Sequence, residues 1–597
     1  MADENLDGQR RPKLKLNKKK ITKQLKKVEG ATVRHAHKFI IKRWSNVREV
    51  QTKVLLWIIV MAFLILSTGL QLMWFQKGYL TSAPVAGGTY AEAVLGPVNT
   101  LNPLFAETSA EQSASYLLFS SLLRYDTTGN LNNDLASSIS INDAHTVFTV
   151  SLRRDVKWHD GKPLTSKDVV FTVGLIKNSA VRSTITGWSN ISVKAVDDHT
   201  VEFALPSVYA AFEHALTFSI LPEHILGKVA PSNIRENNFS QNPVGSGPFR
   251  FKFTQNSTSD PDDKIIYLSR NSDYYNGLAN ILQFQLDVYD NTDEIISALS
   301  SNEVNAAADL SPIDIAKVDS QRYSVAVRPI QSGVYAIINA RSEIMNNVDL
   351  RHALRLATDT SAIVSSLPKG TKALGLPFTD GQLTGDVPVA PSYNLAQAQQ
   401  ILNDSGWAVG DNGVRQKDGK ALKLSAVVIK DSEFEHTFDI LSKQWLKAGI
   451  SVDLQIVDPN DASQNVIQNI LQPRTFDILL YRLNIGADPD VYAYWDSSQA
   501  TAQGLNFSNY SNTISDDALA SARSRIGSSL RNAKYITFAK QWLYDTPAIA
   551  LYQSTSQYVY RRSMDILDSS PVLVSAIDRY SNVLTWSVGS RTVYKTP

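Results

Sequence analysis

LRRDVKWHDGKPLTSKDVVFT, residues 152–172, is the stretch of sequence that decides the fold. Apolar residues at every second position of its first part predict a strand that runs to Trp158. Asp160 and Gly161 predict a tight turn, because glycine readily adopts the positive φ that such turns need. Thr165 and Asp168 have the spacing of a capping box, so an apolar helix is expected to begin there.

His159 and Asp160 are the two residues of this stretch that suggest chemistry, as an acid–base or metal pair. Adjacent residues of a strand point to opposite faces, which suits a shared site poorly. We therefore expect both side chains to hold the turn between strand and helix.

The sequence of residues 152–172 closely resembles the signature of extracytoplasmic solute-binding proteins of peptide-type ABC transporters. This family, solute-binding protein family 5, includes dipeptide-, oligopeptide- and nickel-binding receptors. The resemblance implies an α/β, two-lobed periplasmic-binding-protein-like fold (type II), of the large peptide-binding subclass with an extra subdomain. The signature residues, for which a structural role is implied, are Trp158, His159, Asp160, Gly161, Pro163 and Asp168.

Further segments carry the same resemblance from Gly87 nearly to the end of the chain. Examples are GGTYAEAVLGPVNTLNPLF (87–105), LLRYDTTGNLNNDLA (122–136) and DLRHALRLATDTSAIV (349–364), the last expected to be a helix. Asn133 stands where the family usually has proline. In NPVGSGPFRF (242–251), glycines flank the serine directly, so a tight turn is expected rather than a nucleophile elbow.

The charge of the chain is distributed unevenly. The net charge of the 597 residues is only +2, but residues 1–53 contain 16 Lys and Arg against 5 Asp and Glu. The remaining residues contain 43 against 52, so a basic tail precedes an acidic body. The chain has no cysteine, which excludes disulfides, thiol catalysis and cysteine-ligated metals.

Residues 54–75, VLLWIIVMAFLILSTGLQLMWF, contain no charge. As a helix they would span about 33 Å, enough for a hydrocarbon core of about 30 Å. Basic residues before the helix predict a cytoplasmic tail and an exported body, as in a single-pass protein of the cell membrane. A nucleic-acid-binding tail and a cleaved signal peptide are the alternatives; the preceding segment is long for a signal peptide.

These observations predict the following organisation. A basic cytoplasmic tail (1–53) is followed by a transmembrane helix (54–75) that contacts the lipid bilayer, and by a linker (76–87). The body then consists of a first lobe (88–335) with an extra subdomain near 119–215, a second lobe (336–544) and a C-terminal return to the first lobe (545–597).

The loop after Phe476 is the best candidate for ligand contact. In peptide-binding relatives this region carries a Trp and an acidic residue that pairs with the amino terminus of the peptide. Here the Trp position falls near Arg482 or Leu483, and the acidic position falls near Asn484 or Ile485. The missing acid puts the usual amine clamp in doubt.

Several side chains are candidates to contact the ligand. Arg482 is expected to face a carboxylate; the alternatives are a surface arginine or one paired with Asp488. Asp488 and Asp490 are expected either to supply the acid from a shifted loop or to cap a turn. For Tyr481 and Trp495, core packing is the alternative to a cleft wall. The full set of predicted ligand-binding residues is Asn102, Tyr481, Arg482, Asn484, Asp488, Asp490 and Trp495.

The sequence predicts no catalytic residue, no metal site and no cofactor. Its nine histidines are dispersed, and no P-loop or HExxH motif occurs. We therefore expect a protein without enzymatic activity that captures a peptide or similar small solute outside the cell and delivers it to an ABC permease, with no nucleic-acid partner. The alternatives are a different cargo, such as an oligosaccharide, an opine-like compound or a metal chelate, and a sensory receptor or scaffold without transport.

Overall fold

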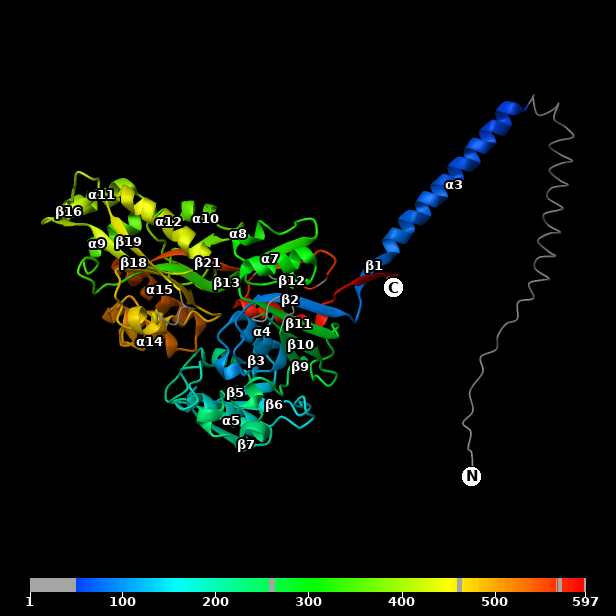
Figure 1. The fold of residues 1–597 in the computed structure, drawn as a ribbon, viewed down its shortest axis with the longest axis horizontal. Coiled ribbons are helices and arrows are strands. Elements are labelled where there is room, and N and C mark those ends of the chain that lie inside the picture. Colours follow the sequence, from blue (N-terminus) through cyan, green and yellow to red (C-terminus); the bar gives the residue numbers. More distant parts are fainter. Residues whose placement is uncertain (1–49, 257–262, 459–463, 565, 567–571, 595–597) are drawn as a thin grey trace. The chain divides into compact units, whose positions relative to one another are not determined.

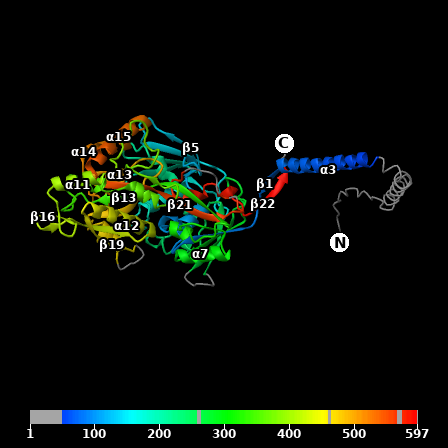
Figure 2. The same cartoon turned by 90° about the horizontal axis from the view of Figure 1, so that it is seen from above.

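The computed structural model describes residues 50–256, 263–458, 464–564, 566 and 572–594. They divide into a small unit, residues up to Ala83 together with the chain end from Thr592, and a body, Pro84–Arg591. In the small unit, helix α3 (Gln51–Tyr79) is followed by strand β1 (Leu80–Pro84), which pairs with β22 (Ser590–Tyr594) (Figure 2). The predicted linker 76–87 is therefore largely the end of α3 and a strand.

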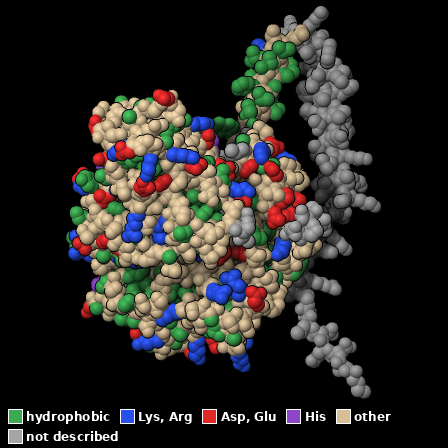
Figure 3. Space-filling model, turned by 60° about the vertical axis from the view of Figure 1, so that its left-hand side comes forward, with side chains coloured by type: hydrophobic (Ala, Val, Ile, Leu, Met, Phe, Trp, Pro, Cys, Tyr) green, Lys and Arg blue, Asp and Glu red, His purple; other side chains and the backbone are tan. Residues whose placement is uncertain are grey.

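Helix α3 contains the predicted span 54–75. Its apolar side chains are exposed along the described part of the helix, and they form the green stripe in Figure 3. Among the described residues, α3 is the one helix long and apolar enough to cross a membrane, over Gln51–Phe75.

The body is built around one mixed sheet of 11 strands within the described residues, which confirms the predicted α/β class. The pairs β2–β11, β2–β12, β18–β19 and β18–β20 are parallel, and the other pairs are antiparallel. The strand order is β19 (Ser451–Val457), β18 (Lys423–Ile429), β20 (Ile478–Asn484), β13 (Tyr323–Ile338), β21 (Ala548–Arg561), β12 (Ala306–Ala307), β2 (Thr89–Leu95), β11 (Gln283–Tyr289), β10 (Lys264–Arg270) and β9 (Phe249–Asn256), with β14 (Lys372–Ala373) also paired to β21.

Separate hydrophobic cores define two lobes. In the first lobe, alternation along β2 sends Tyr90 into one core and Ala91 into another, on opposite faces of the sheet. In the second lobe, alternation along β20 places Leu480 in one core and Leu479 in another, on opposite faces of the sheet. Figures 1 and 2 show α12 (Ser432–Lys447) on one face of the second-lobe sheet and α14 (Thr513–Arg523) with α15 (Ser528–Asp545) on the other.

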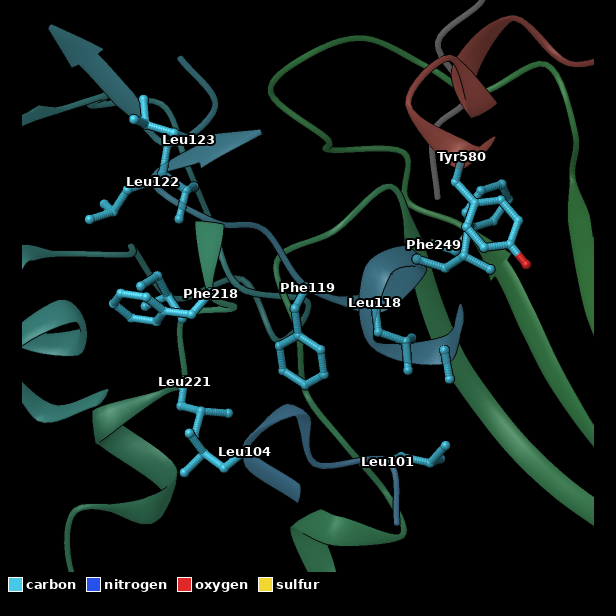
Figure 4. Close-up of a cluster of buried hydrophobic side chains, with 14 of the residues drawn as sticks. Leu101, Leu104, Leu118, Phe119, Leu122, Leu123, Phe218, Leu221, Phe249 and Tyr580 are labelled. Carbon is cyan, nitrogen blue, oxygen red and sulfur yellow. The ribbon is translucent and has the colours of Figure 1, made fainter. Parts of the chain in front are cut away.

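The larger core of the first lobe gathers side chains from η2 (Pro103–Phe105), α4 (Ser109–Leu118) and the segment that follows α4 (Figure 4). Other first-lobe elements are α6 (Glu223–Leu226), η3 (Phe212–Thr217), η4 (Pro231–Asn233), η5 (Asn238–Ser240), α7 (Thr292–Ser301), α8 (Pro312–Ile315), η8 (Ala576–Tyr580), η9 (Val583–Thr585), β3 (Leu123–Tyr125) and β4 (Leu131–Asn133).

A buried charge pair lies inside the first lobe. Glu92 of β2 is 0% exposed, and its carboxylate accepts hydrogen bonds from the Arg579 guanidinium at 2.8 and 3.1 Å. The hydroxyls of Tyr558 and Tyr580 donate to the same carboxylate at 2.6 and 2.7 Å. These four donors satisfy a charge that burial would otherwise penalise strongly.

Strands β13 and β21 pass side by side from one lobe to the other (Figure 1). Tyr323 and Val559 pack in the first lobe, whereas Val334 and Ile549 pack in the second. Their register breaks between Pro329 and Gly333, at the crossing between the lobes.

A four-stranded antiparallel sheet forms a subdomain of the first lobe, with the strand order β5 (Ala136–Ile141), β6 (Val147–Leu152), β8 (Thr200–Ala204) and β7 (Ser192–Asp197). The predicted strand continuing to Trp158 is wrong, because β6 ends at Leu152 and the Trp158 N–H donates to the Lys162 carbonyl within the turn. Helix α5 (Ser166–Lys177) begins with the predicted capping box of Thr165 and Asp168.

The predicted helix 349–364 is two helices, α9 (Val348–Leu356) and α10 (Thr360–Ser365), because the Asp359 side chain caps a new start by accepting from the Ala362 N–H at 3.1 Å. The remaining second-lobe elements are α11 (Leu395–Asp404), β15 (Ala408–Val409), β16 (Arg415–Lys417), β17 (Lys420–Ala421), η6 (Ile467–Leu471), α13 (Tyr492–Trp495) and η7 (Ser497–Gln499).

Candidate ligand-binding site

The second lobe presents the carboxyl ends of its parallel strands β18 and β20 next to the crossing of β13. Asn484, the last residue of β20, lies opposite Ser332, which belongs to the part of β13 where the register breaks. Ligands of open α/β sheets bind beyond the carboxyl ends of the strands. We call Arg482, Asn484 and the following loop, residues 485–491, the lobe-2 edge.

A pocket of ≈ 360 Å³ is bounded by both lobes. Its first-lobe wall comes from residues between Gly187 and Tyr209, and its second-lobe wall from Tyr492 and residues 520–524. The Arg523 guanidinium lies 4.5 Å from the ring centroid of Tyr209 and 4.7 Å from that of Tyr492. The Ala210 N–H donates to the Arg523 carbonyl at 2.9 Å, so the lobes touch here through backbone and side chain.

Both acids of the lobe-2 edge are already neutralised. Asp488 receives two hydrogen bonds from the Arg531 guanidinium, at 2.7 and 2.8 Å, in the forked geometry that arginine forms with carboxylates. Asp490 lies 3.1 Å from the Arg523 Nε. Burial raises the pKa of Asp490, which the positive charge of Arg523 opposes. The predicted pairing of Arg482 with Asp488 is therefore wrong.

The two residues at the expected position of the acid, Asn484 and Ile485, carry no charge. Ile485 is buried, and its N–H donates to the Gln331 carbonyl at 2.9 Å. Asn484 is exposed, and its Oδ1 accepts a hydrogen bond from the Ser332 hydroxyl at 2.8 Å. No carboxylate stands at either residue to clamp an amine.

Arg482 is the exposed cation of the lobe-2 edge, with 39% of its side chain accessible. Its guanidinium lies 5.0 Å from the ring centroid of Phe434 and 3.7 Å from Oε1 of Glu433. Glu433 accepts a hydrogen bond from the Tyr552 hydroxyl at 3.0 Å. Burial raises the pKa of Glu433, and the charge of Arg482 opposes that shift.

Three predicted ligand residues are occupied inside the protein. Trp495 is 1% exposed and packs in the second-lobe core, so it does not form a cleft wall. Asn102 is 0% exposed; its Oδ1 caps η2 through the Leu104 N–H, and its Nδ2 donates to Ser240. Tyr481 is half-buried against Phe507, with ring centroids 5.3 Å apart.

The signature turn has contacts that are internal to the first lobe. His159 Nδ1 accepts from the Gly245 N–H at 3.2 Å, and Nε2 donates to the Gly247 carbonyl at 3.1 Å. Both nitrogens are thereby used by a neutral imidazole, and burial lowers the pKa of His159 to about 4. Asp160 instead contacts His224, at 2.8 Å from Nε2. The turn itself uses Gly161, whose φ is +88°.

The other signature residues support the same turn. Lys157 and Pro163 form an isolated bridge across it, and Trp158 is 1% exposed. Asp168 accepts from the Thr165 N–H at 2.8 Å and from the Glu223 N–H at 2.9 Å.

A first-lobe pocket of ≈ 210 Å³ was not anticipated from the sequence. It is lined by residues of β3, η3 and η8, including Arg124, Tyr125 and Asp578. The Tyr116 hydroxyl is buried there without a hydrogen-bond partner among the described residues. Burial raises the pKa of Tyr125, and the negative charges of Asp578 and Asp488 raise it further. No local signal reveals this site, because Tyr125 and Asp578 are far apart in the sequence.

A second first-lobe pocket, of ≈ 430 Å³, shares Tyr116, Thr217, Ser219 and Ile577 with the first. Both pockets combine aromatic walls with hydroxyl groups, as small-molecule sites commonly do. Within the described residues, no group of three or more His, Asp or Glu side chains is placed to hold a metal ion.

Comparisons with known proteins agree with this architecture. Residues 130–504 match the model of the bacterial extracellular solute-binding proteins, family 5, middle region. The chain is 27% identical over 483 residues to the oligopeptide-binding protein AppA of Bacillus subtilis (strain 168), a match that covers 79% of this chain and 87% of AppA.

Solved structures give the same result. AppA from Bacillus subtilis in complex with a nonapeptide superposes with a TM-score of 0.71 at 25% identity, covering 85% of this chain and 99% of AppA. NikZ from Campylobacter jejuni in complex with Ni(L-His) gives a TM-score of 0.72 at 24% identity, covering 84% and 99%. The likeness to NikZ concerns the fold alone.

Proposed function

Because the chain belongs to family 5 of the bacterial extracellular solute-binding proteins, we propose that it captures a peptide between its two lobes and delivers it to an ABC permease. The family consists of solute-binding proteins and not of enzymes. Binding without covalent chemistry requires enclosure of the solute, and closure of two lobes around it produces a form that a transporter can recognise.

The observation that carries this proposal is the ≈ 360 Å³ pocket bounded by both lobes, at the Tyr209–Arg523 contact. The two first-lobe pockets add space of ≈ 210 and ≈ 430 Å³ for side chains of a ligand. Peptides of varied sequence suit such a site, because backbone groups supply affinity and pockets tolerate different side chains.

Helix α3 is proposed to anchor the protein in the cell membrane, with the basic tail in the cytoplasm and the body outside. The length and composition of Gln51–Phe75 support a membrane span, and the 16 Lys and Arg of residues 1–53 support this orientation. Alkaline carbonate extraction tests the anchor: the full chain is expected to stay with the membranes, and its release would contradict the proposal.

A non-peptide solute is the second candidate ligand. Ile485 and Asn484 favour it, because neither residue supplies the acid with which peptide-binding relatives hold an amino terminus.

Native mass spectrometry of the full chain, purified in detergent, followed by denaturing release of bound species, tests the function. A heterogeneous set of peptides is expected. Release of one defined non-peptide solute would contradict peptide as the ligand but would agree with a role in transport. An empty protein that gains no thermal stability from peptide or sugar pools would contradict capture and favour a receptor or scaffold.

A further inference from the structure

Arg482 and Asn484 lie on one face of β20, at the end of the strand that adjoins the crossing between the lobes. In the register with β13, Arg482 is opposite Val334 and Asn484 is opposite Ser332. Residues two apart on a strand share a face, with Cα atoms about 6.6 Å apart. Further back on this face, Leu480 is fully buried, so the two polar residues stand where the core on this face ends.

The guanidinium of Arg482 has unused hydrogen-bonding capacity. Among the described residues it has no hydrogen-bond partner, and the nearest acid, Glu433, is 3.7 Å away, beyond hydrogen-bond length. The Phe434 ring, 5.0 Å from the guanidinium, supports it from one side. Glu433 is held by the Tyr552 hydroxyl at 3.0 Å, so it balances the charge of Arg482 from a distance without occupying its donors.

The amide of Asn484 is oriented for the same purpose. Its Oδ1 accepts from the Ser332 hydroxyl at 2.8 Å, and its backbone carbonyl accepts from the Tyr494 hydroxyl at 2.8 Å. The first bond orients the side chain, the second holds the backbone, and the Nδ2 donors are left without a partner among the described residues. The strand therefore offers guanidinium and amide donors side by side.

The acids of the loop 485–491 bear on whether the lobe-2 edge binds an anionic or a cationic group of the ligand. Asp488 and Asp490 are paired with Arg531 and Arg523, and the one oxygen of Asp490 without a hydrogen-bond partner among the described residues, Oδ1, is buried. We infer that the lobe-2 edge binds a carboxylate of the ligand through Arg482 and Asn484, and that a peptide is held there by its carboxyl terminus. This inference rests on the proposed function and deepens it by assigning the ligand group that the second lobe recognises.

Three peptide mixtures test the inference on the full chain in detergent. They are random heptapeptides with both termini free, the same mixture with amidated carboxyl termini, and the same mixture with acetylated amino termini. Competition binding is expected to show that amidation weakens affinity about 10- to 100-fold, the range for a charge-assisted hydrogen bond. Acetylation is expected to change the affinity less than threefold, since both acids of the lobe-2 edge are paired with arginines.

Arg482→Gln is expected to lower the affinity for the free-acid mixture to that for the amidated mixture, and Arg482→Lys to restore part of the difference. Arg341→Gln is the matched control, because Arg341 is also exposed but follows the opposite end of β13. The Arg341→Gln variant is expected to discriminate between the free-acid and the amidated peptide mixtures as strongly as the unmodified chain does.

The outcomes separate the inference from the function on which it rests. Equal binding of acid and amide, or discrimination that survives Arg482→Gln, would overturn the inference while peptide capture stands. Failure of all three mixtures to bind the unmodified chain would overturn peptide capture, and the inference with it.

Discussion

The contact between Tyr209 and Arg523 joins the lobes in the wall of the ≈ 360 Å³ pocket, so its removal is expected to weaken ligand binding by disfavouring the closed form. Tyr209 packs against the first-lobe core, and Arg523 is the last residue of α14 in the second lobe. Tyr209→Leu keeps apolar bulk but removes the ring face that lies 4.5 Å from the guanidinium. The backbone bond from Ala210 to Arg523 remains, so one lobe contact is altered and the other is retained.

The magnitude follows from the geometry. A cation–π contact is worth about 0.5–1 kcal/mol at exposed sites and about 2 kcal/mol when desolvated. Tyr209 is half-buried, so the closed form is expected to lose about 0.5–2 kcal/mol relative to the open form. If the ligand binds the closed form and the free protein is mainly open, the apparent Kd rises about 2- to 30-fold.

Tyr492→Leu is the matched control. Tyr492 lines the same pocket as Tyr209, and its ring lies 4.7 Å from the same guanidinium, but it belongs to the second lobe, as Arg523 does. It is expected to leave the balance between open and closed forms unchanged. Calorimetric Kd values and small-angle scattering of the ligand-free protein measure both variants. Equal losses of affinity in the two variants, or none in Tyr209→Leu, would refute the reasoning.

Further predictions concern stability, measured by chemical and thermal unfolding. Gly245→Ala is expected to destabilise the first lobe by about 1–3 kcal/mol, because its Cβ would clash with the backbone oxygen of Leu118 at the end of α4. Gly174→Ala, within α5 and with open space around it, is expected to stabilise by about 0.5–1 kcal/mol; the reverse order of the two effects would contradict the close packing at Gly245. Burial raises the pKa of Asp287 from 3.8 to about 7. Between these two pH values the folded chain keeps a proton that the unfolded chain has released, so the free energy of unfolding falls as the pH rises from about 4 to about 7. Asp287→Asn is expected to flatten that fall and to gain about 1–3 kcal/mol at neutral pH; an unchanged pH profile would exclude this carboxyl as its source. Arg579→Met is expected to lower the free energy of unfolding by about 3–5 kcal/mol, because it leaves Glu92 buried without its cation. The double variant Arg579→Met, Glu92→Gln is expected to regain most of this stability. Equal losses in the single and the double variant would show that packing, and not charge, dominates.

Local features of this chain could be predicted from the sequence because their determinants lie within a few residues. The capping box of Thr165 and Asp168 is one case. The helix start at Asn394, whose side chain accepts from the Gln397 N–H, is another. The division of the predicted helix 349–364 into α9 and α10 could not be predicted, because the apolar spacing continues through Asp359, where the second helix begins.

The partners of the site residues could not be predicted, because the fold brings them from distant segments. Asp488 and Arg531 are 43 residues apart, and their pairing depends on how α15 packs beside the loop. Arg482 lies near Glu433, which precedes it by 49 positions and belongs to another helix. That residues 482–485 contain no acid could be read from the sequence, because the identity of a residue is visible without a fold.

The pair of Glu92 and Arg579 also sets an order of assembly during synthesis. The two residues are separated by 487 positions, and the ribosome delivers Glu92 first. Until Arg579 emerges, burying the Glu92 carboxylate would leave a charge without its cation, and β21 is also absent from its place beside β12. The second lobe, whose chain is made in between, can complete its core earlier. The first lobe can therefore bury Glu92 together with its cation only after the C-terminal segment is in place, so its completion depends on both ends of the body.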